Sequence, residues 1–472
     1  MFEREAYLTL RFSSRTRMGK QGILLQDDIE TQRNAMLRLR GFRFLGELPS
    51  SEGGGGHPFS ADWCDRLVRH VGLSCTAPAE SNSSVRAAAV SALQTVLRNA
   101  AACDGMLRPA LLTSAMMSLR LGLGDANASV RTSAVQALAA LAPHLPQASS
   151  ESSDEGSEVV LLVLHLASDA AGDVRSAAAA ALASFAGAVR SRREGTGGAS
   201  DHGAQMVKVA AAVAKLCSDT SDKVRASALR ATGVVAEVFE SFDSAVHGTF
   251  AELLVEGVQR APAKCQWNAC RSAGQLLCCA AVASHQEARS VIDTLLPALC
   301  QQVSSAENLK VRIQAAQALC QMLEAEELLF KATEDIELIL SAACDAVDFV
   351  SQGGTAPGLP AAAEAATAAG APPGLSPTAD VKSDRQHAAY LEQLRSELLT
   401  LVQRCSTAAP SARCSRLEEA APWLRRWAAS SPRAAPAKAS AASASDGNDF
   451  EATLAGQERA FISIPTSFNF RR

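Results

Sequence analysis

Aromatic residues are scarce in this sequence. They make up 4% of the chain, with two tyrosines and four tryptophans. Antiparallel sheets depend on aromatic and β-branched side chains, so a β-sheet fold is disfavoured. Apolar residues are 47% of the chain, and many are alanine and leucine, which suit closely packed helices. At 472 residues the chain is too long for one compact core, so several units or an extended array are expected.

The sequence also lacks an excess of charge and a long apolar run. Its formal net charge is −4, so no overall field favours nucleic acid or an anionic membrane as a partner. No apolar run reaches the ~18 residues that a transmembrane helix needs. Residues 1–20 carry Glu3, Arg4 and Glu5 and no apolar core, which predicts that they are not a secretory signal. We therefore expect no membrane partner, and nucleic acid is a disfavoured one.

Paired or clustered cysteines are missing as well. The thirteen cysteines form no C-x-x-C motif, and no Cys/His group has the spacing of a zinc site. Cys278 and Cys279 are adjacent, so they would point in different directions from a helix. Buried thiols in a reducing compartment are the simplest interpretation. This predicts an intracellular protein, either cytoplasmic or nuclear, that holds no metal and no cofactor.

What the sequence does contain is a repeat. A Val-Arg pair opens a helical pattern with its valine at positions 85, 130, 174, 224 and 311, and Cys265 occupies the equivalent position between the last two. We call this first position the Val place. The successive intervals are 45, 44, 50, 41 and 46 residues. HEAT and armadillo repeats have a similar period, ~40–47 residues.

Each repeat reads as helix A, a short turn with an aspartate, and helix B opening on Val-Arg. In one B segment, an apolar stripe recurs at helical spacing through Val224, Ala228, Ala231, Val235 and Val238. A helix pair with two apolar flanks can bury both only by stacking on further copies. The sequence therefore predicts an all-α fold, an α-solenoid of about seven HEAT-like helix pairs.

Composition divides the chain into three parts. Residues 1–59 are an N-terminal extension of uncertain fold, and residues 60–405 are the solenoid. A Gly/Pro/Ala-rich insertion at 351–383 is predicted to be disordered, and smaller insertions are expected at 146–158 and 190–203. Residues 406–472 are predicted to form a capping helix and a disordered tail.

Acidic and arginine residues recur six positions apart in the first repeats. The aspartate can cap helix B, and an arginine in the first turn of a helix is tolerated if it reaches an acid. Stacked repeats would then form a structural ladder; an anion-binding stripe is the alternative. Gln266 replaces the arginine in the fifth repeat, so one pair should be missing there, which predicts a weaker joint. The predicted ladder residues are Glu80, Arg86, Asp125, Arg131, Asp169, Arg175, Asp219, Arg225 and Arg312.

A polar strip is predicted on the B helices of the later repeats. Positions three, six and ten after the Val place share one helix face, away from the apolar stripe. Amide and guanidinium groups there suit a peptide backbone or an acidic segment, and B helices line the inner, concave face of HEAT-type stacks. A plain solvated face is the alternative. The predicted partner-binding residues are Arg230, Asn268, Arg271, Gln275, Gln314, Gln317 and Gln321.

Two stretches carry a closer resemblance. "KCQWNACRSAGQLL" at 264–277 is similar to a run in the HEAT repeat-containing protein 6 family, and "LKVRIQAAQAL" with "LEQLRSELLTLV" resembles the C-terminal part of the same family. Cys265-Gln266 departs from the family's Val-Arg, and Arg271 from its tyrosine. The resemblance implies a helical scaffold and supplies no catalytic residue.

Catalytic motifs are absent. No histidine is followed by glutamate, unlike the iron-binding HEAT-like deoxyhypusine hydroxylases, and neither a phosphate-binding loop nor G-x-S-x-G occurs. His165 lies in an apolar run and is predicted to be buried, as are Cys270 and Cys320.

We therefore expect a non-catalytic scaffold that binds a protein or peptide. A transport or adaptor solenoid that carries cargo is the alternative, followed by a nucleic-acid-binding or enzymatic HEAT protein.

Overall fold

The computed structural model describes most of the repeat region. Two compact units divide the chain, Met1–Ala428 and Ala429–Arg472, and the helices below belong to the first unit except for the last two residues of α18. Residues 1–59, Glu80, most of the 351–383 insertion and the tail beyond residue 430 lie outside the described residues. The described residues are 40, 68, 71, 72, 81–101, 109–144, 155–196, 203–239, 243–282, 286–324, 333–352, 378–408 and 415–430.

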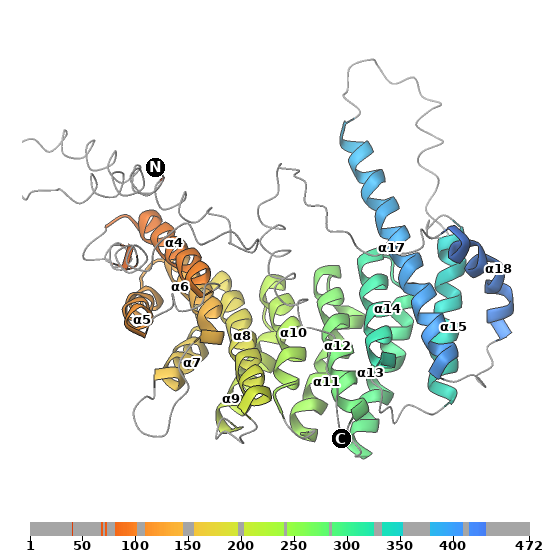
Figure 1. Ribbon diagram of the computed structural model, residues 1–472, viewed down its shortest axis with the longest axis horizontal. Helices are drawn as coiled ribbons and strands as arrows, with labels where there is room; N and C mark the ends of the chain where they lie inside the picture. The colour runs from red at the N-terminus through yellow and green to blue at the C-terminus, as the bar shows by residue number, and fades with distance from the viewer. Residues whose placement is uncertain are drawn as a thin grey trace, which may run out of the picture. The chain divides into compact units, whose positions relative to one another are not determined.

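Every regular element in these ranges is a helix (Figure 1). The A helices are α5 (Pro109–Leu123), α7 (Glu155–Leu166), α9 (Gly203–Cys217), α11 (Ser244–Arg260), α13 (Gln286–Ser305) and α15 (Thr333–Ser351). The B helices are α4 (Ser83–Ala101), α6 (Ala128–Leu141), α8 (Gly172–Thr196), α10 (Asp222–Ala236), α12 (Ala263–Val282), α14 (Leu309–Glu324) and α17 (Thr378–Ala408). A short 3-10 helix, η1 (Ala142–His144), follows α6, and α18 (Ser415–Ser430) follows α17.

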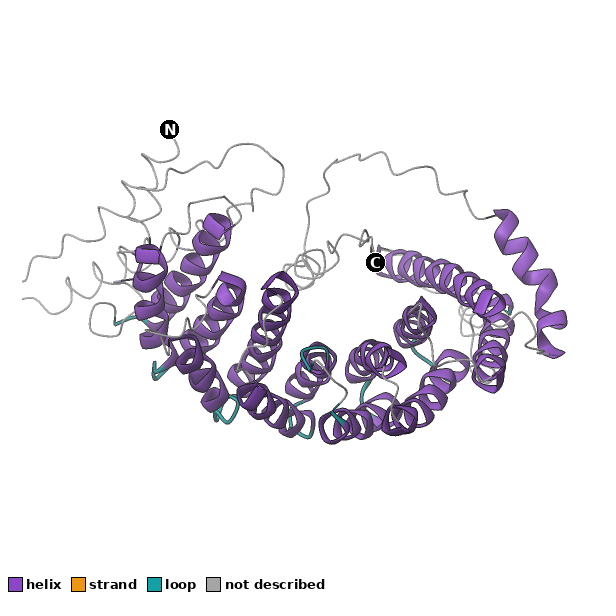
Figure 2. Ribbon diagram, turned by 60° about the horizontal axis from the view of Figure 1, so that its bottom comes forward, coloured by secondary structure: helices purple, strands orange, loops and turns teal. Residues whose placement is uncertain are grey.

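The helices form two layers. Each A helix packs on the B helix that follows it, and each B helix packs on the next B helix along the chain, from α4 through to α17 (Figures 1 and 2). Six A–B pairs are complete within the described residues, and α4 is the B helix of the pair before them. This architecture is the predicted α-solenoid of helix pairs.

Small apolar residues explain why B helices stack directly. The valines at the Val place are fully buried, as is Cys265, and so are Ala228, Ala231 and Val235 of the predicted stripe. At Gly274 the backbones approach so closely that an added Cβ would lie 2.8 Å from Cα and Cβ of Ala318. A contact this close needs glycine at position 274.

Several helices extend further than the sequence predicted. Ser351 belongs to α15 and residues 378–383 to α17, so the predicted disordered insertion is too long at both ends. Likewise α7 begins at Glu155 and α8 continues to Thr196, inside the two smaller predicted insertions. Arginine and glutamate favour helix, and they extend α8 through a segment that its polar composition alone marked as loop.

Two predictions about buried side chains have different outcomes. Cys270 and Cys320 are buried in helix packing, as predicted. The prediction for His165 is wrong, because it lies on the exposed side of α7. Among the histidines whose burial is described, His247 is the buried one; it lies in the first turn of α11, and its Nδ1 is 3.1 Å from the backbone nitrogen of Asp243. An apolar run on an A helix thus has one side that faces away from the B layer.

The C-terminal helix α18 packs on the last repeat. Ala420 and Trp427 are buried, and Arg416 forms ion pairs with Asp345 and Asp348 of α15. The guanidinium of Arg395, on α17, lies 5.7 Å from the ring centroid of Trp427. No helix in the described ranges is long and apolar enough to cross a membrane.

Candidate functional site: the polar ladder and the face of the B helices

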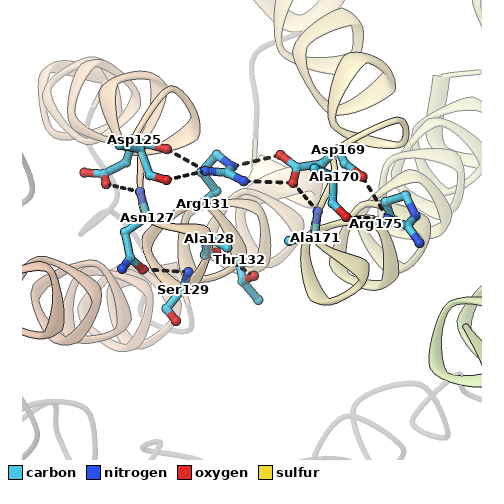
Figure 3. Close-up of polar contacts among 11 residues, drawn as sticks. Asp125, Asn127, Ala128, Ser129, Arg131, Thr132, Asp169, Ala170, Ala171 and Arg175 are labelled. Atoms are coloured by element: carbon cyan, nitrogen blue, oxygen red, sulfur yellow. Dashed lines mark hydrogen bonds and ion pairs between the residues drawn. The ribbon is translucent and has the colours of Figure 1, made fainter.

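Arginine and aspartate side chains link successive repeats at the start of the B helices. Arg86 of α4 makes two hydrogen bonds to Asp125 in the next turn, with Nε 2.7 Å from Oδ2 and Nη2 2.9 Å from Oδ1. Arg131 of α6 holds Asp169 in the same bidentate way, at 2.8 Å for both bonds (Figure 3). Bidentate, charge-assisted pairs of this geometry are stronger than neutral hydrogen bonds.

A third pair continues the series. Nε and Nη2 of Arg175 lie 2.7 and 2.9 Å from the carboxylate of Asp219. Each arginine therefore binds the aspartate of the following repeat, not the one six residues before it. The aspartate six residues before each arginine contributes its backbone carbonyl instead. Arg131 donates to the carbonyl of Asp125, and Arg175 donates to the carbonyl of Asp169, both at 2.8 Å (Figure 3).

Each aspartate also organises its own turn. The carboxylate of Asp125 accepts a hydrogen bond from the backbone N–H of Asn127, and Asp169 and Asp219 accept the equivalent bond two residues on, at 2.8–2.9 Å. The arginine bonds, followed by these backbone bonds and nearby positive charge, hold the pKa of all three carboxyls below the usual value. The carboxylates and arginines of these pairs are thus already bound within the fold, which favours a structural ladder over an anion-binding stripe.

The ladder ends at α10. Arg225 donates to the carbonyl of Asp219 at 2.9 Å and pairs with Asp222 of its own helix, because the next turn carries no aspartate. Cys265 occupies the Val place there, and its sulfur lies 3.4 Å from the carbonyl oxygen of Asp222. Gln266 thus stands where the sequence predicted a missing pair.

Arg312 does not join the ladder. Its side chain is buried and binds three carbonyl oxygens at the C-terminal end of α13, those of Val303, Ser304 and Ala306. Its guanidinium lies 3.8 Å from the ring centroid of Phe349, and burial lowers its pKa to about 10. The position six residues earlier is alanine, so the arginine caps a helix end, where a cation is favourable.

The predicted polar strip lies on the outer surface of the B layer. At six residues after the Val place, Ser91, Gln136 and Ala180 are exposed, and Arg230, Arg271 and Gln317 are half-buried. Because α10, α12 and α14 pack side by side, they bring the last three onto one surface. This is the position at which successive B helices all reach solvent.

Not every predicted member of the strip is available there. Asn268 is buried and donates a hydrogen bond to the carbonyl of Lys264 at 2.8 Å. Gln314 donates to Gln317, which in turn donates to Glu397 of α17 at 2.8 Å. Gln321 is exposed. Asn268 and Gln314 thus find partners within their own helices, Gln317 is bound to α17, and Gln321 faces solvent.

Sequence reasoning missed the acidic residues of this face. Glu237 pairs with Arg190 of α8 and accepts a hydrogen bond from Gln275 at 3.2 Å, and Glu324 pairs with Arg404 of α17. Glu237 and Glu324 both lie thirteen residues after a Val place. Extending the repeat alignment by three positions would have found them. The face is therefore zwitterionic, with carboxylates set beside amides and guanidinium groups.

The described residues offer little for chemistry. They contain no group of three or more His, Cys, Asp or Glu side chains arranged to hold a metal ion. Burial raises the pKa of the Cys217 and Cys320 thiols to about 12, far from the range of a reactive thiolate. These cysteines are core residues and not nucleophiles.

The solved structures similar to this chain include helical-repeat proteins. No family model and no curated protein matches the chain. A designed armadillo repeat protein is 19% identical, with 54% of this chain and 99% of that chain covered at a TM-score of 0.37. A structure of Kap95p bound to RanGDP is 15% identical, with 90% of this chain and 54% of that chain covered at a TM-score of 0.38. The chain is an all-α solenoid of armadillo/HEAT-like helix pairs, a conclusion that its own repeats and helix layers carry.

Proposed function

We propose that the protein is a non-catalytic scaffold that binds a protein or peptide partner on the face of its B helices. The observation that carries the proposal is the convergence of Arg230, Arg271 and Gln321 from three successive B helices on one solvent-facing surface. Repeat solenoids present such continuous surfaces because each repeat places equivalent residues side by side. In a HEAT-type solenoid this surface would be the inner, concave one.

The chemistry of the face suits an extended polypeptide. Amides donate and accept hydrogen bonds, so they can pair with both groups of a peptide backbone. Guanidinium groups bind carboxylates in bidentate fashion. Glu237 and Glu324 are each paired with an arginine, so the face also suits a segment that carries both signs of charge or few charges.

The setting is intracellular in this proposal, and no cofactor takes part. The nine cysteines in the described ranges are in the thiol form, and seven of them are buried, as in proteins of reducing compartments. The similarity of residues 264–277 to the HEAT repeat-containing protein 6 family would make the chain a relative of that scaffold. This affiliation rests on Trp267, Asn268, Ala269 and Cys270, which follow the family's order.

A capture experiment with two matched variants tests the proposal. Arg230→Ala, Arg271→Ala and Gln321→Ala together remove the outward groups of α10, α12 and α14. Gln317 is left in place because it holds Glu397. The control, Ser91→Ala with Gln136→Ala, changes the same repeat position on α4 and α6. We expect partners retained by the parent to be lost from the triple variant and kept by the control. Equal capture by all three proteins would reject the B-helix face as the binding surface.

A further inference from the structure

Arg225 is held in its own turn like the ladder arginines, but it lacks their partner in the next repeat. Its Nη1 donates to the carbonyl of Asp219 at 2.9 Å, just as Nη1 of Arg131 donates to the carbonyl of Asp125. In Arg131 the remaining nitrogens, Nε and Nη2, then bind the carboxylate of Asp169 (Figure 3). The guanidinium of Arg225 is therefore anchored as in an intact pair, without the carboxylate that completes it.

The acid that Arg225 uses instead is exposed to solvent. Its Nη2 pairs with Asp222, whose side chain is 59% exposed, whereas the aspartates of the three ladder pairs are 3%, 9% and 11% exposed. Arg225 is itself 26% exposed, more than any of the three ladder arginines. An exposed ion pair contributes little free energy, so another carboxylate can displace it. Arg225 is thus a positioned cation that an outside acid can reach.

A second arginine occupies the sequence position of the missing aspartate. The ladder aspartates stand five residues before the Val place, and in the fifth repeat that residue is Arg260, the last residue of α11. Its side chain is exposed and makes no hydrogen bond or ion pair within the described ranges. The sulfur of Cys265, two residues into α12, lies 3.4 Å from the carbonyl oxygen of Asp222. The turn that follows Arg260 therefore leads directly to the N-terminal end of α10.

The side chains around this turn are mainly cationic. Lys264, in the first turn of α12, is exposed, and its ammonium has no hydrogen bond or ion pair to any described residue. Together with Arg225 and Arg260 it adds a third positive charge, against the single carboxylate of Asp222. Like charges repel one another, and an added anion relieves that repulsion. A guanidinium group binds a carboxylate through two parallel hydrogen bonds, which is the contact that the intact ladder pairs make.

We propose that Arg225, Arg260 and Lys264 form a carboxylate-binding site, which we call the open rung. An aspartate or glutamate of a polypeptide partner takes the place of the aspartate that the ladder lacks here. This inference deepens the proposed function and rests on it, because the bound polypeptide supplies the acid. The open rung lies at the N-terminal ends of α10 and α12, and Arg230 and Arg271 lie further along the same helices.

Binding of a short acidic peptide to the full chain tests the open rung. The probe is a dye-labelled glycine–serine peptide with two central aspartates, beside the same peptide with two central asparagines, and fluorescence anisotropy at low salt follows binding. We expect the parent to bind the acidic peptide at least about tenfold more tightly. Arg225→Gln and Arg260→Asp should each remove this preference. Arg260→Asp should also raise the melting temperature, because its carboxylate completes the pair with Arg225.

Lys215→Asp is the matched control. It makes the same change in net charge on α9, where Lys215 is exposed and has no hydrogen bond or ion pair to a described residue, so it should keep the preference. The triple variant of the B-helix face should keep it too, which separates a failure of this site from a failure of the proposed function. Thermal melting of Arg225→Gln checks that its fold is kept.

Four results would overturn the open rung. The first is equal binding of the two peptides by the parent, and the second is a preference that survives Arg225→Gln or Arg260→Asp. The third is an equal loss in Lys215→Asp, which would show attraction by net charge alone. The fourth is a melting temperature of Arg260→Asp at or below that of the parent, which would show that Arg225 does not reach position 260.

Discussion

Arg131 and Asp169 are 38 residues apart in the chain, yet two guanidinium nitrogens of Arg131 lie 2.8 Å from the two carboxylate oxygens of Asp169. Both side chains are largely buried, at 16% and 9% exposure. The same pairing joins Arg86 to Asp125 and Arg175 to Asp219. The first four repeats are thus tied by a continuous series of arginine–aspartate pairs, which stops at α10.

Removing one member of a ladder pair should destabilise the fold. Asp169→Asn leaves the buried guanidinium of Arg131 with a neutral partner, and we expect a loss of about 1–3 kcal/mol in the free energy of unfolding. Urea denaturation measures this loss in the free energy of unfolding. Lys223→Ala is the control, because its pair with Asp173 is exposed and should contribute well under about 1 kcal/mol. Equal effects of the two substitutions would contradict the structural role of the ladder.

The ladder also predicts how stability depends on pH. The folded-state pKa of Asp125, Asp169 and Asp219 is lowered, so the unfolded chain binds more protons in acid. Their contribution is fully present above the unfolded value, about pH 4, and is lost as pH falls through the folded values. The urea midpoint should therefore drop below about pH 4. In a variant with asparagine at all three positions, the urea midpoint should fall less steeply as the pH is lowered. The same steep fall in this variant would contradict the prediction.

Gly274 and Gly248 provide a matched pair of substitutions. Gly274→Ala places a Cβ 2.8 Å from Ala318, so we expect a loss of about 1–3 kcal/mol from overpacking. Gly248→Ala meets open space in a helix and should stabilise by up to about 1 kcal/mol. Thermal melting distinguishes the two substitutions, because we expect Gly274→Ala to lower the melting temperature and Gly248→Ala to raise it. A neutral Gly274→Ala would show that α12 and α14 can separate at little cost.

The fifth repeat should not be a weak joint, although the sequence predicted one. Three polar contacts tie α12 to α10 in place of the missing pair. They join Cys265 to Asp222, Ser272 to the carbonyl of Arg230 at 3.2 Å, and Gln275 to Glu237. We expect backbone amides of α12 and α10 to exchange hydrogen at similar rates. Faster exchange in α12 would restore the original prediction.

The sequence was sufficient for the repeat architecture because period and apolar stripe are local signals. The helical spacing of Val224 and Ala228 is enough to predict that both side chains are buried. Partners across repeats were harder to predict. Whether Arg131 meets Asp125 or Asp169 depends on how repeats stack, and Arg312 follows the Val-Arg pattern yet binds carbonyls because alanine stands at position 306. His165 shows the same limit, since an apolar run does not tell which side of an A helix meets the B layer.

The footprint of a bound partner tests the central claim most directly. Hydrogen exchange of the full chain, measured with and without a partner that the parent captures, reports which helices gain protection. We predict slower exchange in α10, α12 and α14, with exchange in the A helices unchanged. Protection confined to the A helices, or to segments outside the B layer, would contradict it.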